Sequence, residues 1–205
     1  IERLHLATSE PRAAFAPDAR FAAGDPGAPV LVTIYACGRS EACGRMIPRL
    51  YRELMEGRLQ GKAQLHYRPF FPNDREDAAR CGRALVAAAD QGRFWPFLLT
   101  LYARQDQFRA CMLQKWADLE GLDQDAFRIA YDHPKTNAFL DQVHKEGVAN
   151  RVTDVPTVFI NGFRVVGPMT EQSLIEQIEI EYANRAPRET PPPPPTVEPR
   201  QEGLP

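Results

Sequence analysis

A junction between a strand and a helix, residues 34–48, constrains the fold of this chain more than any other stretch. The apolar run Val30-Leu31-Val32-Thr33-Ile34 precedes it and predicts a strand that is buried on both faces. An amphipathic segment from about residue 42 to residue 59 follows and predicts a helix. Cys43 then falls in the first helical turn, where the helix dipole and unpaired N–H groups are expected to lower the pKa of its thiol.

The segments after this junction predict an α/β chain. Residues 64–71 read as a second strand, and residues 75–150 carry helical patterns almost throughout. Two β-like runs within residues 158–166 flank Asn-Gly, which is a strong hairpin signal. Residues 170–182 predict a last amphipathic helix. The expected order is therefore strand, helix, strand, helical block, hairpin and helix.

Three short segments in this order resemble the DsbA-like thiol–disulfide oxidoreductases. They are Gly-Asp-Pro-Gly-Ala-Pro-Val at residues 24–30, Ala-Ala-Ala-Asp-Gln-Gly-Arg-Phe-Trp at 87–95, and Val-Pro-Thr-Val-Phe-Ile-Asn-Gly at 155–162. The resemblance covers about residues 24–182. It implies an α/β, thioredoxin-like fold that carries an inserted all-helical subdomain.

This resemblance predicts a domain organisation. Residues 1–23 are expected to form an N-terminal arm, residues 24–72 and 151–183 the thioredoxin-like domain, and residues 73–150 the inserted helical subdomain. Residues 184–205 are a Pro-rich tail with five consecutive prolines, a composition that cannot bury a core. We interpret this segment as a solvated tail. The alternative is that residues 187–199 bind a partner.

The cysteine pattern departs from that of the resembled family. Cys43 and Pro48 keep the family's spacing between the second active-site cysteine and the helix proline, so Ser40 falls on the position of the first, nucleophilic cysteine. A serine hydroxyl forms no disulfide, and the dithiol cycle needs one thiol to attack and another to resolve. The active site is therefore predicted to be degenerate, unless Cys37, on the other side of the turn, replaces the missing thiol.

Two disulfides are compatible with the four cysteines. A Cys37–Cys43 bridge would join the strand end to the helix, either as a structural staple or as a redox pair. A Cys81–Cys111 bridge would link two helices of the helical block, and it is slightly preferred over the alternative of buried apolar thiols.

The resemblance also implies a cis peptide bond between Val155 and Pro156. This bond would lie beside the active-site turn, where the backbone of Val155 could pair with an extended peptide. The expected partner at this position is therefore a protein or a peptide strand.

Composition and motifs argue against several classes of function. A net charge of −2 indicates neither a nucleic-acid nor an anionic-membrane partner. No apolar run approaches the ~20 residues of a membrane span. The four histidines have no metal-ligand spacing, and no glycine-rich phosphate loop is present, so we expect neither a metal nor a cofactor.

Two functional hypotheses follow. The first is a peptide-binding or complex subunit that retains the groove beside Pro156 and has lost dithiol exchange. The alternative is an active oxidoreductase that uses Cys43 with or without Cys37. The serine at position 40 gives the binding hypothesis a slight advantage, and the resemblance implies export, in bacteria to the periplasm.

Overall fold

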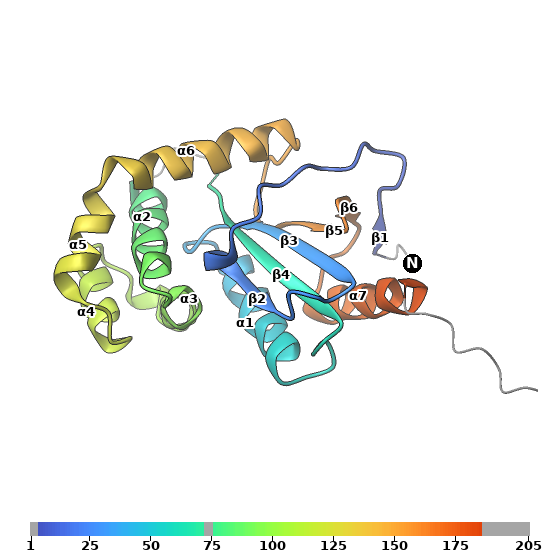
Figure 1. Ribbon diagram of the computed structural model, residues 1–205, viewed down its shortest axis with the longest axis horizontal. Helices are drawn as coiled ribbons and strands as arrows, with labels where there is room; N and C mark the ends of the chain where they lie inside the picture. The colour runs from blue at the N-terminus through green and yellow to red at the C-terminus, as the bar shows by residue number, and fades with distance from the viewer. Residues whose placement is uncertain (1–3, 72–75, 186–205) are drawn as a thin grey trace, which may run out of the picture.

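A six-stranded mixed sheet forms the centre of the molecule (Figure 1). A computed structural model describes residues 4–71 and 76–185. The strand order is β1-β6-β5-β3-β4-β2, in which β3 and β4 run parallel and the other described pairings are antiparallel. The strands are β1 (His5–Leu6), β2 (Ala22–Gly24), β3 (Val30–Ala36), β4 (Ala63–Pro69), β5 (Thr157–Ile160) and β6 (Phe163–Val166).

The helices confirm the predicted fold class. Five of them lie in the chain between β4 and β5 and gather mainly to one side of the sheet (Figure 1). They are α2 (Glu76–Asp90), α3 (Phe94–Ala103), α4 (Met112–Leu119), α5 (Gln124–Asp132) and α6 (Pro134–Ala149). Helix α1 (Glu41–Met55) follows β3, and α7 (Glu171–Arg185) follows the hairpin. The division into domains at residues 72 and 150 stays a prediction.

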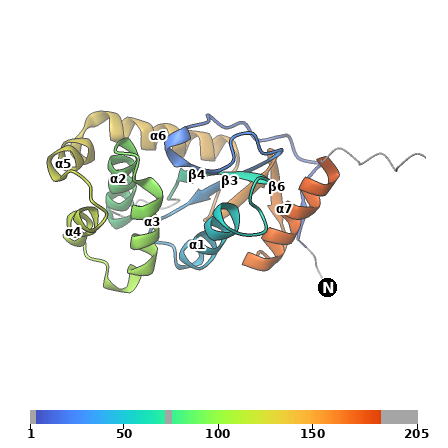
Figure 2. The ribbon, with the colours of Figure 1, turned by 60° about the horizontal axis from the view of Figure 1, so that its bottom comes forward.

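Strand β3 is covered on both faces, as its apolar sequence predicts. Successive side chains of a strand point to opposite faces. Val32 and Ile34 belong to the large core cluster that also contains Leu50 of α1 and Ile178 of α7. Tyr35 belongs to a second cluster on the other face, with Phe70, Phe159 and residues of α6. Figure 2 shows α1 and α7 on one side of the sheet and α6 on the other.

Helix α1 begins and ends close to its predicted limits. Ser40 is the N-cap, and the helix continues through Pro48 to Met55. It ends earlier than residue 59 because the chain turns at Glu56, whose N–H bonds to the carbonyl oxygens of Arg52 and Glu53. Leu59 is nevertheless fully buried.

The N-terminal arm contains a strand that the sequence did not predict. Residues 22–24 form β2, an edge strand that pairs with β4, whereas β1 pairs with β6 at the other edge. The arm thus crosses the sheet from one edge to the other (Figure 1). Ala-Ala-Gly has neither alternation nor β-branched residues, so the pairing comes from the backbone of β4 and not from local propensity.

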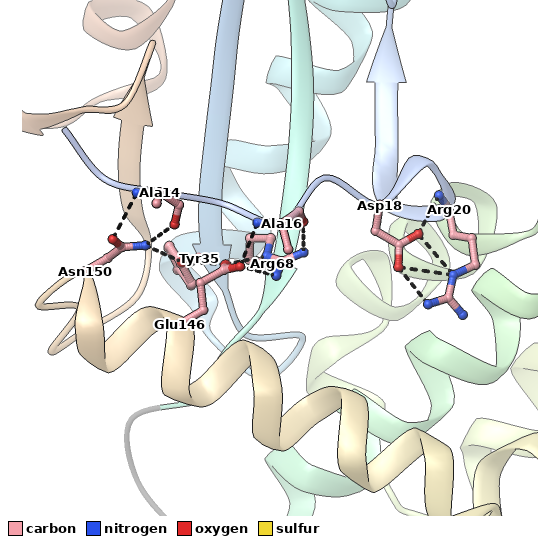
Figure 3. Close-up of polar contacts among 8 residues, drawn as sticks. All are labelled: Ala14, Ala16, Asp18, Arg20, Tyr35, Arg68, Glu146 and Asn150. Carbon is pink, nitrogen blue, oxygen red and sulfur yellow. Dashed lines mark hydrogen bonds and ion pairs between the residues drawn. The ribbon is translucent and has the colours of Figure 1, made fainter.

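A buried polar network holds the arm against the sheet (Figure 3). The guanidinium of Arg68 in β4 forms two bonds to the carboxylate of Glu146 in α6, at 2.7 and 2.8 Å, and a third to the carbonyl oxygen of Ala16 at 2.9 Å. Tyr35 donates to the same carboxylate at 2.7 Å, and the N–H of Ala16 donates to it at 2.9 Å. The network ties the arm to β3, β4 and α6.

Two predicted features lie outside the described residues. The Pro-rich tail, apart from its first two positions, falls in the undescribed residues 186–205. The domain boundary expected between residues 72 and 73 falls in the undescribed segment 72–75. Within the described residues, no helix is long and apolar enough to cross a membrane.

Candidate functional site

The turn between β3 and α1 consists of Cys37, Gly38, Arg39 and Ser40. The Oγ of Ser40 accepts a hydrogen bond from the N–H of Cys43 at 3.3 Å, and the Ser40 carbonyl accepts the N–H of Gly44 at 3.0 Å. Ser40 therefore caps the helix, because its side chain satisfies one of the N–H groups that have no partner within the helix. Cys43 lies in the first turn, as predicted.

The Cys43 thiol is less acidic than the sequence predicts. It is fully buried, and this burial raises the pKa of Cys43 to about 11, while the hydrogen bond with Ser40 acts in the opposite direction. Loss of water disfavours the thiolate more than the helix terminus favours it. The expected lowering of the pKa was therefore wrong for Cys43.

Cys37 lies close to Cys43 across the turn. Its Sγ accepts the N–H of Arg39 at 3.3 Å, and its carbonyl oxygen accepts the hydroxyl of Tyr102 at 3.4 Å. A hydrogen bond from the Cys37 backbone lowers the pKa of the Cys43 thiol, and the charge of Cys37 raises it. The fold has thus brought Cys37 close enough to Cys43 to influence the ionisation of the Cys43 thiol.

Neither predicted bridge, Cys37–Cys43 or Cys81–Cys111, is formed in the structure, in which Cys43, Cys81 and Cys111 are thiols. Cys81 is fully buried in α2, whereas Cys111 is exposed at the start of α4. Cys81 lies against the turn that contains Cys37: a Cβ added to Gly38 would lie 3.5 Å from the Cβ of Cys81. Helical periodicity does not predict this, because the contact joins residues more than forty positions apart in the chain.

The helical block anchors the cysteine turn through Gln105. The Nε2 of this residue donates to the carbonyl oxygens of Gly38 at 3.0 Å and Ser40 at 3.1 Å. Arg39 returns a hydrogen bond to the Gln105 carbonyl at 2.9 Å, and its guanidinium lies 4.1 Å from the ring centre of Phe108. The backbone of the turn is therefore held in place by a short 3-10 turn, Gln105–Gln107, that follows α3.

Sequence reasoning missed Gln105 and two buried tyrosines. The hydroxyls of Tyr67 and Tyr102 are 3.3 Å apart, and burial raises the pKa of both well above the usual value. Nothing in the local sequence distinguishes these residues from ordinary core or loop positions. Their role depends on β4 and α3 meeting beside the cysteine turn.

The Val155–Pro156 peptide bond is cis, and both residues line a groove of about 530 Å³. Helix α1 forms the opposite wall. The lining includes Ala42 and Met46 from α1, and Met169 and Thr170 before α7. Ala42 precedes Cys43 in the chain, so the structure brings the residues predicted to bind peptide next to the cysteine-bearing helix.

The charges at the rim of this groove are paired. Arg49 forms an ion pair with Glu171 at 3.0 Å, and Arg45 forms one with Glu41. Asp154 adds a further negative charge to the lining. This balance suits a peptide of mixed composition better than a strongly acidic ligand. Among the described residues, no group of three or more His, Cys, Asp and Glu side chains could hold a metal ion.

Comparison with family models and curated proteins relates most of the chain to known sequences. The family described as Thioredoxin matches residues 18–180. Na(+)/H(+) antiporter NhaA 3 of Salinispora tropica is 29% identical over 168 residues, which is 82% of this chain and 26% of the antiporter. NhaA 1 of Mycolicibacterium vanbaalenii is 32% identical over 128 residues, or 53% of this chain and 18% of that protein. The chain thus spans about a quarter or less of these curated relatives.

Solved structures share the same architecture. A thioredoxin-like oxidoreductase from Silicibacter pomeroyi has a TM-score of 0.67 at 18% identity, covering 84% of this chain and 100% of its own. Oxidised BdbD from Bacillus subtilis has a TM-score of 0.69 at 14% identity, covering 85% and 100%. Alpha-DsbA1 of Wolbachia pipientis has a TM-score of 0.67 at 20% identity, covering 80% and 91%. At these identities, the likeness establishes a common fold.

Proposed function

The chain belongs to the thioredoxin family, and on that basis we propose that it is a DsbA-like thiol–disulfide oxidoreductase with Cys37 and Cys43 as its redox pair. The observation that carries this proposal is that Ser40 links the two cysteines: its N–H donates to the carbonyl oxygen of Cys37 at 3.0 Å, and its Oγ accepts the N–H of Cys43 at 3.3 Å. The sequence alone favoured a binding function, because Ser40 occupies the family's nucleophile position. The proximity of Cys37 supports the redox alternative.

Cys37 is the better attacking group of the pair. Its Sγ already accepts a backbone N–H, and such a hydrogen bond stabilises a thiolate. The thiolate of Cys37 attacks a sulfur of a substrate disulfide and forms a mixed disulfide, while the other substrate sulfur leaves as a thiolate and takes up a proton. Cys43 then attacks Cys37 Sγ, closes the Cys37–Cys43 disulfide and releases the second substrate thiol. Two electrons thus pass from the protein to the substrate, so the protein is oxidised and the substrate is reduced.

The groove beside Pro156 is proposed as the substrate site. An extended polypeptide with a disulfide, lying along Val155, would place its sulfur atoms near the start of α1. The paired charges of the rim favour a protein substrate without strong net charge. Because disulfides persist in oxidising compartments, this activity fits an exported protein, and the bacterial periplasm is the proposed location.

A second candidate function rests on the state of Cys43. A fully buried thiol with a pKa raised to about 11 is mostly protonated at neutral pH, so it resolves a mixed disulfide slowly. This supports a peptide-binding subunit that uses the Pro156 groove without turnover. A partner for residues 187–199 stays a prediction in either case.

Thiol counting combined with a turnover assay distinguishes these functions. We expect mass spectrometry of the oxidised chain to show a Cys37–Cys43 bond that mild reductant opens. Reduction of a model disulfide is expected to disappear in Cys37→Ala and to persist in Cys111→Ala, the matched control with an exposed thiol. A bond that resists reductant, together with no turnover, would instead support the binding function.

A further inference from the structure

Cys81 supplies a third thiol to the cysteine turn from a different part of the fold. It lies in the middle of α2 and is fully buried. Its Cβ would be 3.5 Å from a Cβ on Gly38, the residue next to Cys37. Gly38 is also close to Leu101 of α3, whose Cδ2 would be 3.2 Å from the same added Cβ. Helix α2 and the turn are therefore in direct contact at the glycine that follows Cys37.

Cys37 acts electrostatically on both of the other thiols. Its charge raises the pKa of Cys43, and, after burial, it is the largest cause that raises the pKa of Cys81. The other charges that act on Cys81 are Arg39, which lowers its pKa, and Asp77, which raises it. The burial of Cys81 by itself has a simpler interpretation, since buried cysteines often serve as small apolar groups. The contact of Cys81 with the cysteine turn distinguishes it from a buried cysteine that only fills space in the core.

We propose that Cys81 is a second resolving thiol, which attacks Cys37 Sγ in a mixed disulfide and closes a Cys37–Cys81 bond. This inference rests on the proposed role of Cys37 as the attacking cysteine. The bond would tie α2 of the helical block to the end of β3. A mixed disulfide on Cys37 would then be resolved within the chain in two ways, by formation of the Cys37–Cys43 bond or of the Cys37–Cys81 bond.

The step balances without any further oxidant. The substrate is a molecule with a disulfide, and one of its sulfur atoms is bound to Cys37 Sγ after the first attack. Cys81 loses its proton and attacks Cys37 Sγ, so that the bond between Cys37 and the substrate breaks as the Cys37–Cys81 bond forms. The substrate sulfur leaves as a thiolate and takes up a proton. The chain has then lost two electrons to the substrate.

The test removes the first resolving thiol and follows the second. The full chain carrying Cys43→Ala and Cys111→Ala is reduced, then treated with oxidised glutathione, and its peptides are mapped by mass spectrometry without reduction. We expect a peptide pair linked through Cys37 and Cys81 and release of both glutathione molecules. Since only a thiolate attacks and burial raises the pKa of Cys81, the rate of closure should rise about tenfold per pH unit near neutrality.

The control adds Cys81→Ala to the same background. Glutathione is then expected to stay on Cys37. If glutathione also stays on Cys37 when Cys81 is present, the inference is wrong while the proposed function stands. If Cys37 takes up no glutathione in either variant, both the proposed function and this inference are overturned. A parallel variant with Cys43→Ser guards against a folding defect specific to Cys43→Ala, and circular dichroism checks that each variant is folded.

Discussion

The Cys43 thiol is governed by its burial more than by its place in a helix. Burial raises the pKa of Cys43 from its ordinary value of 9.0 to about 11, so between these pH values the folded chain binds more protons than the unfolded chain. The free-energy contribution of this group to folding is therefore fully present below about pH 9 and is lost as the pH rises toward 11.

The first prediction concerns this pH dependence. The free energy of unfolding of the reduced protein should fall between pH 9 and 11 more steeply in the wild type than in Cys43→Ala. Denaturant titrations at several pH values measure the difference, with Cys111→Ala as a control that should follow the wild type. Parallel curves for the wild type and Cys43→Ala would contradict the raised pKa.

A second prediction at the residue scale concerns Ser40. Ser40→Cys would place a thiol at the N-cap, three residues before Cys43, where the helix terminus lowers a thiol pKa. Each unit of lowering increases the thiolate fraction about tenfold near neutral pH, so reduction of a model disulfide should accelerate by about that factor. Ser40→Ala is the control; it should cost about 1 kcal/mol of stability through the lost cap and gain no activity. An unchanged rate in Ser40→Cys would show that position 40 does not reach the substrate.

At the scale of elements, the turn after β3 depends on a short segment of the helical block. Gln105 donates hydrogen bonds to two carbonyl oxygens of the turn. The Gln105 side chain fits there because residue 44 is a glycine: a Cβ added to Gly44 would be 2.6 Å from Gln105 Oε1. The site is therefore built by two elements that are far apart in sequence.

Gln105→Ala tests this dependence. Loss of two hydrogen bonds should cost about 1–3 kcal/mol and should increase hydrogen exchange in residues 37–44. Gln107 of the same 3-10 turn provides the matched control, because Gln107→Ala removes an exposed glutamine side chain. Equal exchange in the two variants would mean that the turn holds its conformation without Gln105.

At the scale of the whole molecule, the Arg68–Glu146 pair joins the arm, the sheet and α6 (Figure 3). The Arg68 side chain is only 3% exposed, so removal of its partner leaves a buried and uncompensated charge. We expect Glu146→Ala to cost about 3–5 kcal/mol, measured by denaturant unfolding. Arg128→Ala disrupts a pair that is 67% and 86% exposed, and it should cost no more than about 1 kcal/mol. Similar losses in both variants would contradict a structural role for the buried pair.

The sequence by itself determined the order of the elements and the local start of the site. The apolar run of β3, the Asn-Gly hairpin and the amphipathic pattern of α1 depend on neighbours in the chain, so local patterns predicted them. The family resemblance supplied the groove residues Val155 and Pro156. These features could be predicted from the sequence because each is encoded within a few consecutive residues.

Only the tertiary structure decided the chemical environment of the cysteines. The pKa of Cys43 depends on how completely other elements exclude water, and the proximity of Cys81 depends on α2 packing against Gly38. The pairing of β2 and the anchor at Gln105 have the same origin. Burial and contact between distant segments are properties of the packed chain, and no local pattern encodes them.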